Sequence, residues 1–163
     1  MRDEAFERLY AEHAQPLFGF LSYRTGDRAL AEDILADTFE RALRARRRFD
    51  RRKASEKTWL YTIALNCLRD HHRRAATEGR VLEHMGSHAQ GTTPGGADAV
   101  EDRDLISRSL GALSDDEREA IALRFGADLT VPEIAKLTGE SSTTARGRLY
   151  RALRKLREEL PDP

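Results

Sequence analysis

Residues 130–157 read TVPEIAKLTGESSTTARGRLYRALRKLR, and this stretch decides the fold class. Thr130 is followed three residues later by Glu133, which is the capping-box pattern of a helix start, and Pro132 in the first turn strengthens this prediction. The helix is short, because Gly139 can end it in the left-handed conformation that glycine adopts without strain. A short capped helix before a glycine turn is the first half of a helix-turn-helix.

The second half is a basic helix that begins at Ser141 or Ser142 and extends to about Leu160. Residues 142–157 include six basic residues and no acidic one. A helix of this charge suits the major groove of DNA, where arginine can bind guanine through two hydrogen bonds and other basic side chains can bind phosphates. A solvated helix face that contacts nothing is the alternative. The expected inward face consists of Ala145, Leu149, Ala152, Leu153 and Leu156.

The net charge of the chain is zero, yet its charges are segregated along the sequence. Residues 41–74 hold 12 basic and 3 acidic side chains, whereas residues 1–40 hold 4 and 9, and residues 75–120 hold 4 and 10. Residues 121–163 have a small basic excess, with 8 basic and 6 acidic side chains. Such segregation favours separate surfaces for separate partners. A solvated helical bundle with chance clustering of charge is the alternative.

The N-terminal part of the chain predicts a bundle of helices. Apolar residues recur at helical spacing over three segments, residues 3–22, 28–47 and 57–74. Pro16 is expected to bend or split the first segment, and residues 25–27 are expected to form a turn. The polar and basic residues 49–56 predict a loop, and no convincing strand occurs.

Residues 76–104 differ in composition, since they contain five of the eleven glycines and almost no large apolar residue. This composition predicts a flexible linker between an N-terminal helical domain, residues 1–75, and a C-terminal one, residues 105–163. The C-terminal domain has a second capping box at residues 114–117, and Gly126 can end the helix that follows it. The fold class is therefore all-α, with two small helical domains joined by a flexible linker.

The helix predicted over residues 57–74 has aromatic residues near its start and basic residues near its end. Such a combination suits single-stranded DNA, whose unstacked bases can be read one by one. Taken alone the pattern is weak, because Trp59 and Tyr61 are readily explained as core residues.

The helix predicted over residues 28–47 carries an acidic face opposite its apolar stripe. This face consists of Asp33, Ala36, Asp37 and Glu40. Because an acidic surface repels DNA, the face favours a basic protein partner. A solvated surface with a pair between Asp37 and Arg41, four residues apart, is the alternative.

Sequence signatures of catalysis are missing, since the chain has no Walker loop and no GxGxxG, HExxH or GxSxG motif. The single Cys67 excludes an internal disulfide and a multi-cysteine zinc site. We therefore expect no enzymatic activity, no metal and no cofactor. No run of about eighteen apolar residues occurs, and the start of the sequence lacks the apolar stretch of a signal peptide. We expect no membrane insertion and a cytoplasmic location.

The order of these motifs resembles the extracytoplasmic-function (ECF) sigma factors of the sigma-70 family. Residues 31–42 are similar to region 2.2 of that family, residues 59–74 to regions 2.3 and 2.4, residues 110–125 to region 4.1, and residues 129–152 to region 4.2. The resemblance spans nearly the whole chain, and no region 3 fits between the two halves. Four positions, at the turn and at the start of the basic helix, depart from the residues that family members often have: Glu140, Thr143, Ala145 and Gly147.

The resemblance implies the partners and the roles of the candidate residues. The N-terminal domain would bind the clamp helices of core RNA polymerase, and the implied contact residues are Asp33, Ala36, Asp37 and Glu40. The loop and helix over 49–74 would capture and help melt the minus-ten promoter element. The C-terminal domain would read the minus-thirty-five element as duplex DNA. Many family members are held inactive by an anti-sigma factor, so such a partner is expected in a stress or signal response.

The implied DNA-binding residues belong to both domains. They are Asn66, Arg69, Asp70, Arg73, Arg74, Thr143, Thr144, Arg146, Arg148, Tyr150, Arg151 and Arg154. Within the basic helix we expect Arg146 and Arg151 to read bases. Arg148, Arg154 and Lys155 are expected to bind phosphates or to have structural roles.

Two other classes of protein are alternatives, but each explains fewer of the sequence features. An ordinary helix-turn-helix regulator that binds duplex DNA without polymerase needs only residues 130–157, and it leaves the similarity to region 2 unexplained. An enzyme that acts on nucleic acid lacks any catalytic constellation in this chain.

Overall fold

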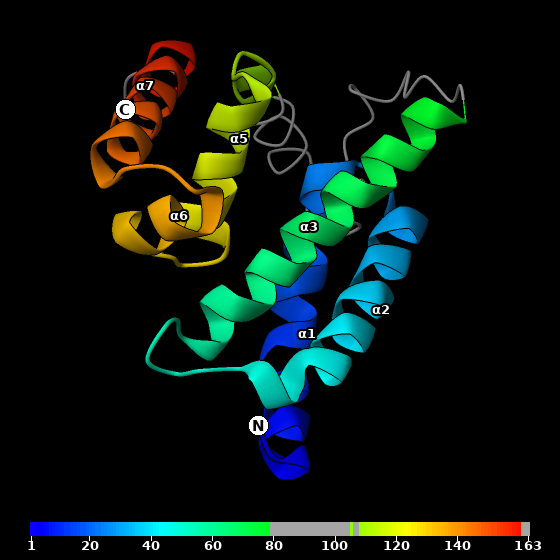
Figure 1. Cartoon of the computed structure of the whole chain (residues 1–163). Coiled ribbons are helices and arrows are strands. Elements are labelled where there is room, and N and C mark those ends of the chain that lie inside the picture. Colours follow the sequence, from blue (N-terminus) through cyan, green and yellow to red (C-terminus); the bar gives the residue numbers. More distant parts are fainter. Residues whose placement is uncertain (79–104, 106–107, 161–163) are drawn as a thin grey trace, which may run out of the picture. The chain divides into compact units, whose positions relative to one another are not determined.

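The structure, a computed structural model, describes residues 1–78, 105 and 108–160, and the chain divides into two compact units, Met1–Ser87 and His88–Pro163 (Figure 1). All regular secondary structure in the described residues is helical, which confirms the all-α fold class. No described helix is long and apolar enough to cross a membrane. From residue 79 onward, the predicted linker lies outside the described residues.

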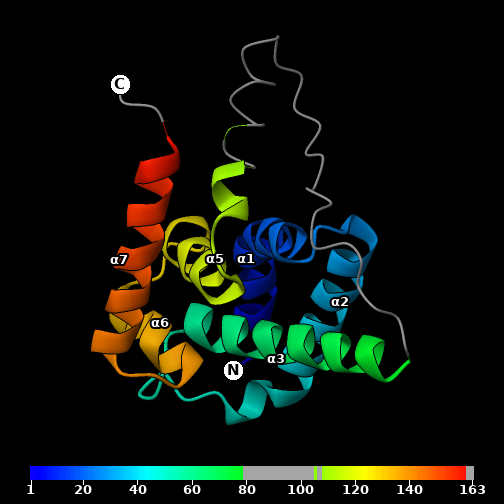
Figure 2. The ribbon, with the colours of Figure 1, turned by 90° about the horizontal axis from the view of Figure 1, so that it is seen from above.

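The described part of unit 1, residues 1–78, contains three long helices, α1 (Asp3–Thr25), α2 (Arg28–Ala45) and α3 (Glu56–Thr77), with a 3-10 turn at Arg46–Arg48. Helix α2 packs against both α1 and α3, and Figures 1 and 2 show α2 and α3 side by side. The fully buried apolar side chains come from all three helices and include Leu9, Leu17, Leu21, Ile34, Leu60 and Leu65. The core therefore fixes the position of α3 relative to α2.

The start of α2 and the course of α1 follow from local chemistry. Gly26 has a φ of 63° and ends α1, and the Asp27 side chain then caps α2 by accepting a hydrogen bond from the Leu30 amide at 3.2 Å. Pro16 lies inside α1, which continues through it, so of the two predicted effects a split does not occur. Pro16 lies on the exposed side of the helix, where water can bind the carbonyl that has no amide partner.

Tyr61 is a core residue. Its ring is fully buried and meets Phe20 edge to face, with ring centroids 5.5 Å apart, and burial raises its pKa to about 12. Trp59 is half-buried and its ring lies 5.0 Å from that of Phe49. The core explanation of Tyr61 is therefore confirmed.

Unit 2 contains α5 (Asp115–Ile121), a π-helical turn (Ala122–Gly126), α6 (Val131–Thr138) and α7 (Ser142–Glu159), and residues 108–111 are also helical. Both α5 and α6 pack against α7. The core is formed by Leu113, Leu123, Leu129, Ile134, Ala135, Ala145, Leu149 and Ala152, among others. Helix α7 is thus held along one side by two shorter helices.

The sequence signals for helix ends in unit 2 are confirmed. Ser114 and Thr130 each form a complete capping box, and Gly139 ends α6 with a φ of 71°. The N-cap of α7 is Ser141, whose hydroxyl accepts a hydrogen bond from the Thr144 amide at 3.2 Å. The helical segment that begins at the Ser114 capping box ends at Gly126 as predicted, and its last five residues form a π-helical turn.

Leu153 departs from the predicted inward face of α7. Ala145, Leu149 and Ala152 are buried, but the side chain of Leu153 is 36% exposed. Only one side of α7 is covered by α5 and α6, so the buried stripe is narrow and Leu153 lies at its edge next to solvent. The prediction that Leu153 points inward is wrong.

Candidate polymerase and nucleic-acid interfaces

The acidic face of α2 is accessible to a partner. Asp33, Ala36 and Glu40 are exposed, and Asp37 is half-buried. The opposite side of the helix is buried, and there the Thr38 hydroxyl donates to the Ile34 carbonyl at 2.7 Å. The four predicted polymerase-binding residues therefore share one accessible side of α2, with Asp37 at the edge toward α3.

Arg41 joins this edge of α2 to α3. Its guanidinium donates to Asp37 through Nε at 3.1 Å and to Asp70 of α3 through Nη1 at 2.7 Å. These bonds, the Asp70 bond foremost, raise the pKa of Arg41, and the same interaction lowers the pKa of the Asp70 carboxyl. Asp70 also accepts from Arg73 at 2.6 Å, and His71 Nε2 lies 3.7 Å from Asp37.

The exposed side of α3 carries the remaining candidates for minus-ten DNA. Asn66, Arg69, Arg73 and Arg74 are all exposed. Near the end of the helix, a shallow hollow is lined by Asp70, Arg73, Arg74, Thr77 and Glu78. Asp70 differs from the other candidates, because its carboxylate accepts hydrogen bonds from two arginines, Arg41 and Arg73.

The loop before α3 adds further basic side chains. Arg47, Arg48, Arg52 and Lys53 are exposed, and Arg51 is paired with Glu56 at 2.7 Å. The loop and the exposed side of α3 belong to the same unit, so unit 1 presents both parts of the predicted single-strand surface on its own.

Helix α7 presents its predicted DNA side to solvent. Thr143, Thr144, Arg146, Tyr150, Arg151 and Arg154 are exposed, and Tyr150 is 62% exposed. These residues lie opposite or beside the stripe that packs on α5 and α6. The outer side of α7 can therefore contact a ligand without any change in the packing of unit 2.

Arg148 is the exception on α7. Its guanidinium forms a two-pronged ion pair with Glu140 at the turn before the helix, and the two side chains are 18% and 22% exposed. The pair lowers the pKa of Glu140 and raises that of Arg148. Of the two roles proposed for Arg148, this geometry favours the structural one.

Lys155 is engaged in the same way. Its Nζ donates to both carboxylate oxygens of Glu117, at 3.0 and 2.9 Å, and so joins α7 to α5. Glu117 also accepts from the Ser114 amide in the capping box, and its pKa is lowered, by Lys155 above all. The arrangement favours a structural role for Lys155 too.

Comparison with known proteins decides the family. Residues 9–78 match the family described as Sigma-70 region 2, and residues 103–156 match the one described as Sigma-70, region 4. The chain is 37% identical over 162 residues to the RNA polymerase sigma factor CarQ of Myxococcus xanthus, covering 96% of this chain and 90% of CarQ. It is 33% identical to the ECF RNA polymerase sigma factor BldN of Streptomyces coelicolor, covering 98% of this chain but only 61% of BldN. The chain belongs to the ECF sigma factors.

Two solved structures share the fold. The sigma factor RpoE from Bartonella quintana, solved in complex with the anti-sigma factor NepR, matches with a TM-score of 0.78 and 24% identity over 96% of both chains. CnrH, solved in complex with the cytosolic domain of CnrY, matches with a TM-score of 0.69 and 25% identity over 96% of this chain and 88% of CnrH. The predicted family and its function as a transcription initiation factor for RNA polymerase are thus confirmed.

Within this sigma factor, the structure brings the predicted site residues together by helix. The acidic set lies on α2, the first DNA set on α3 and the second on α7. Their contacts with polymerase and DNA stay predictions.

Sequence reasoning missed the role of Arg41 between the first two sets. The spacing of four residues to Asp37 was visible, but the second partner, Asp70, lies 29 residues away on another helix. A single sequence carries no signal for such a pair.

Proposed function

We propose that this ECF sigma factor binds core RNA polymerase through the acidic face of α2 and recognises promoters through α3 and α7. The observation that carries the proposal is the separation of charge over the fold. An exposed acidic face and two exposed basic sides lie on three different helices, of which α2 and α3 share the core of unit 1 and α7 packs on the core of unit 2. Separate surfaces of opposite sign fit one protein partner and two DNA segments.

The two DNA surfaces suit different states of DNA. The side of α3 combines basic groups with the polar Asn66 and follows a basic loop, which suits a strand whose bases are unstacked. Helix α7 follows a capped helix and a glycine turn, which is the arrangement that inserts a helix into the major groove of duplex DNA. In this proposal, unit 1 opens the minus-ten element and unit 2 reads the minus-thirty-five element.

The proposal assigns the chemistry of RNA synthesis to the polymerase and none to this chain, and it places the protein in the cytoplasm with its polymerase. It also includes control by an anti-sigma factor. The support for such control is that two structures with this fold were solved with a bound protein: RpoE with the anti-sigma factor NepR, and CnrH with the cytosolic domain of CnrY.

Run-off transcription with purified core polymerase tests the proposal. We expect core polymerase to start transcripts at specific promoters only when this chain is added. An ordinary helix-turn-helix regulator would change transcription only in the presence of another sigma factor. Absence of promoter-specific transcripts across a genomic library of templates would contradict the proposal.

A further inference from the structure

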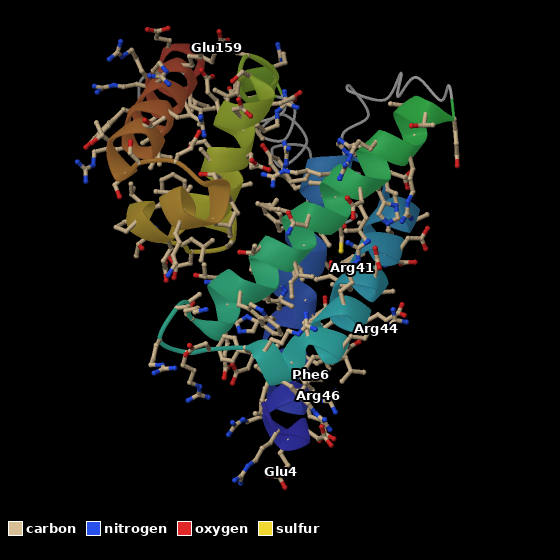
Figure 3. All side chains as sticks on the ribbon, viewed as in Figure 1. Glu4, Phe6, Arg41, Arg44, Arg46 and Glu159 are labelled. Carbon is tan, nitrogen blue, oxygen red and sulfur yellow. The ribbon has the colours of Figure 1, made fainter. Side chains whose placement is uncertain are left out.

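Arg41 lies where the two predicted surfaces of unit 1 meet. Figure 3 labels it on α2 beside α3, with Arg44 further along the same helix. Its Nε and Nη2 atoms each lie 3.1 Å from a carboxylate oxygen of Asp37, and its Nη1 lies 2.7 Å from Asp70. One guanidinium therefore binds a carboxylate on the polymerase side of α2 and a carboxylate on the DNA side of α3.

The chain of ion pairs continues along α3. The second oxygen of Asp70 accepts from Arg73 at 2.6 Å, so the orientation of Arg73 depends on Asp70 and, through it, on Arg41. The side chains of Arg41, Asp37 and Asp70 are 35%, 26% and 28% exposed, so solvent screens the two Arg41 pairs less than the Asp70–Arg73 pair, in which Arg73 is 79% exposed. A planar guanidinium can hold two carboxylates in fixed directions, which an ammonium group cannot do.

We propose that Arg41 is a positioning residue that acts through Asp70 to hold the Arg73 side chain in place on the DNA-binding side of α3. The inference rests on the proposed function, since it takes polymerase docking on α2 and promoter capture on α3 from there. Polymerase bound to α2 then holds Arg73 in the direction that meets the opened strand. Without Arg41, α2 still docks, but Asp70 no longer holds Arg73 in that direction.

Arg44 provides a matched control on the same helix. It carries the same charge, and it pairs with Glu40 four residues earlier on α2 itself. Arg44→Gln and Arg41→Gln therefore remove one positive charge each and one ion pair within α2, but only Arg41→Gln also removes a link to α3. Arg41→Lys keeps the charge without the geometry that binds two carboxylates.

The experiment measures three quantities for each holoenzyme: the affinity for core polymerase, the rate of promoter opening on duplex DNA, and the same rate on a pre-melted promoter. We expect Arg41→Gln and Arg41→Lys to slow opening of the duplex about fivefold, with a smaller loss on the pre-melted template and core affinity within about twofold of the original. Arg44→Gln is expected to stay within about twofold in all three.

A double variant separates positioning from a general loss of structure. Because Arg41→Gln and Asp70→Asn remove the same link, their combination should open the duplex no more slowly than the worse of the two single variants. Thermal unfolding of the isolated protein shows whether each variant folds. If Arg41→Gln fails to fold, Arg41→Lys and Asp70→Asn carry the test.

Three results would each overturn the inference. In the first, Arg41→Gln equals Arg44→Gln in every measurement. In the second, Arg41→Gln lowers core affinity and both opening rates equally, and in the third its effect adds fully to that of Asp70→Asn. In each of these cases the original holoenzyme still opens promoters, so the proposed function stands. If the original protein with core polymerase opens no promoter, the proposed function fails and the inference fails with it.

Discussion

The side chain of Glu140 determines the role of Arg148. The carboxylate stands at the turn before α7 and binds Arg148, which the sequence alone left between a phosphate-binding and a structural role. The Thr138 hydroxyl also donates to Glu140, at 3.0 Å. An acidic residue at this turn therefore holds Arg148 inward, whereas Arg146, Arg151 and Arg154 remain among the exposed cations of α7.

The Glu140–Arg148 pair predicts a pH dependence of stability. Because Arg148 lowers the pKa of Glu140 in the folded state, the pair stabilises the fold fully above the ordinary value of 4.5, and this contribution is lost as the pH falls through the lowered pKa. Glu140→Gln should lower the free energy of unfolding by about 1 kcal/mol at neutral pH. It should also make the free energy of unfolding less dependent on pH below about pH 5. The measurement is the Tm from pH 7 to 3, with exposed Glu158→Gln as control. Parallel curves for Glu140→Gln and the original protein would contradict this prediction.

Asp33 gives the cleanest test of the polymerase-binding face. It is exposed on α2, whereas Asp37 is bound to Arg41, so Asp33 can be reversed in charge without disturbing the pairs that reach α3. We expect Asp33→Lys to weaken binding to core polymerase by about tenfold and to leave the Tm unchanged. Glu32→Lys, one residue earlier and also exposed, is the comparison. Unchanged binding by Asp33→Lys in a titration with core polymerase means that the acidic face is only solvated.

Arg146 and Arg151 are the predicted base readers of α7. A base-reading arginine contributes roughly 1–3 kcal/mol of discrimination at its base pair, whereas a phosphate-binding one strengthens binding to all sequences alike. Arg146→Ala and Arg151→Ala should therefore relax the base preference at particular positions of the minus-thirty-five element. Arg148→Ala should lower the Tm and leave the base preference unchanged. The measurement is transcription from promoters randomised in the minus-thirty-five element. Uniform loss of output with every base preference kept would show that this assignment is wrong.

At the scale of helices, the sequence predicts what depends on neighbours along the chain. The capping boxes at Ser114 and Thr130 and the glycine at 139 were identifiable because their partners lie within a few residues. Leu153 was misjudged because its environment depends on which side of α7 the other helices cover. The same limit applies to the candidate sites: exposure of the residues followed from periodicity, but pairs between helices did not.

Helix α3 carries a prediction about promoter opening. Asn66 and Arg73 lie on its exposed side, away from the core residues of the same helix. We expect Asn66→Ala and Arg73→Ala to slow open-complex formation about tenfold while core binding changes little, because a lost hydrogen bond to the opened strand costs about 0.5–1.5 kcal/mol, and one from a charged group about 1.5–3 kcal/mol. Permanganate footprinting of the minus-ten element measures opening. A pre-melted promoter should restore part of the rate, and equal loss on both templates would point to backbone contacts instead.

For the molecule as a whole, charge predicts that DNA binding depends on polymerase. The 28 basic residues are matched by 28 acidic ones, so the free protein gains little from the general attraction to phosphates. We expect the isolated chain to bind promoter duplex weakly at physiological salt and the holoenzyme to bind it tightly and specifically. Gel-shift titrations with and without core polymerase compare the two. Tight, specific binding by the isolated chain would count against the proposed function.

The ion pairs described above close within single units: Arg41 with Asp37 and Asp70 in unit 1, and Glu117 with Lys155 in unit 2. In natural or engineered recombination, a whole unit can therefore be exchanged without separating the two partners of any of these ion pairs. A hybrid that takes α2 from one relative and α3 from another brings together charges selected in different contexts and leaves carboxylates without their arginine. A hybrid that exchanges a whole unit keeps every one of these pairs, so new combinations of promoter elements are expected to arise by exchange of units.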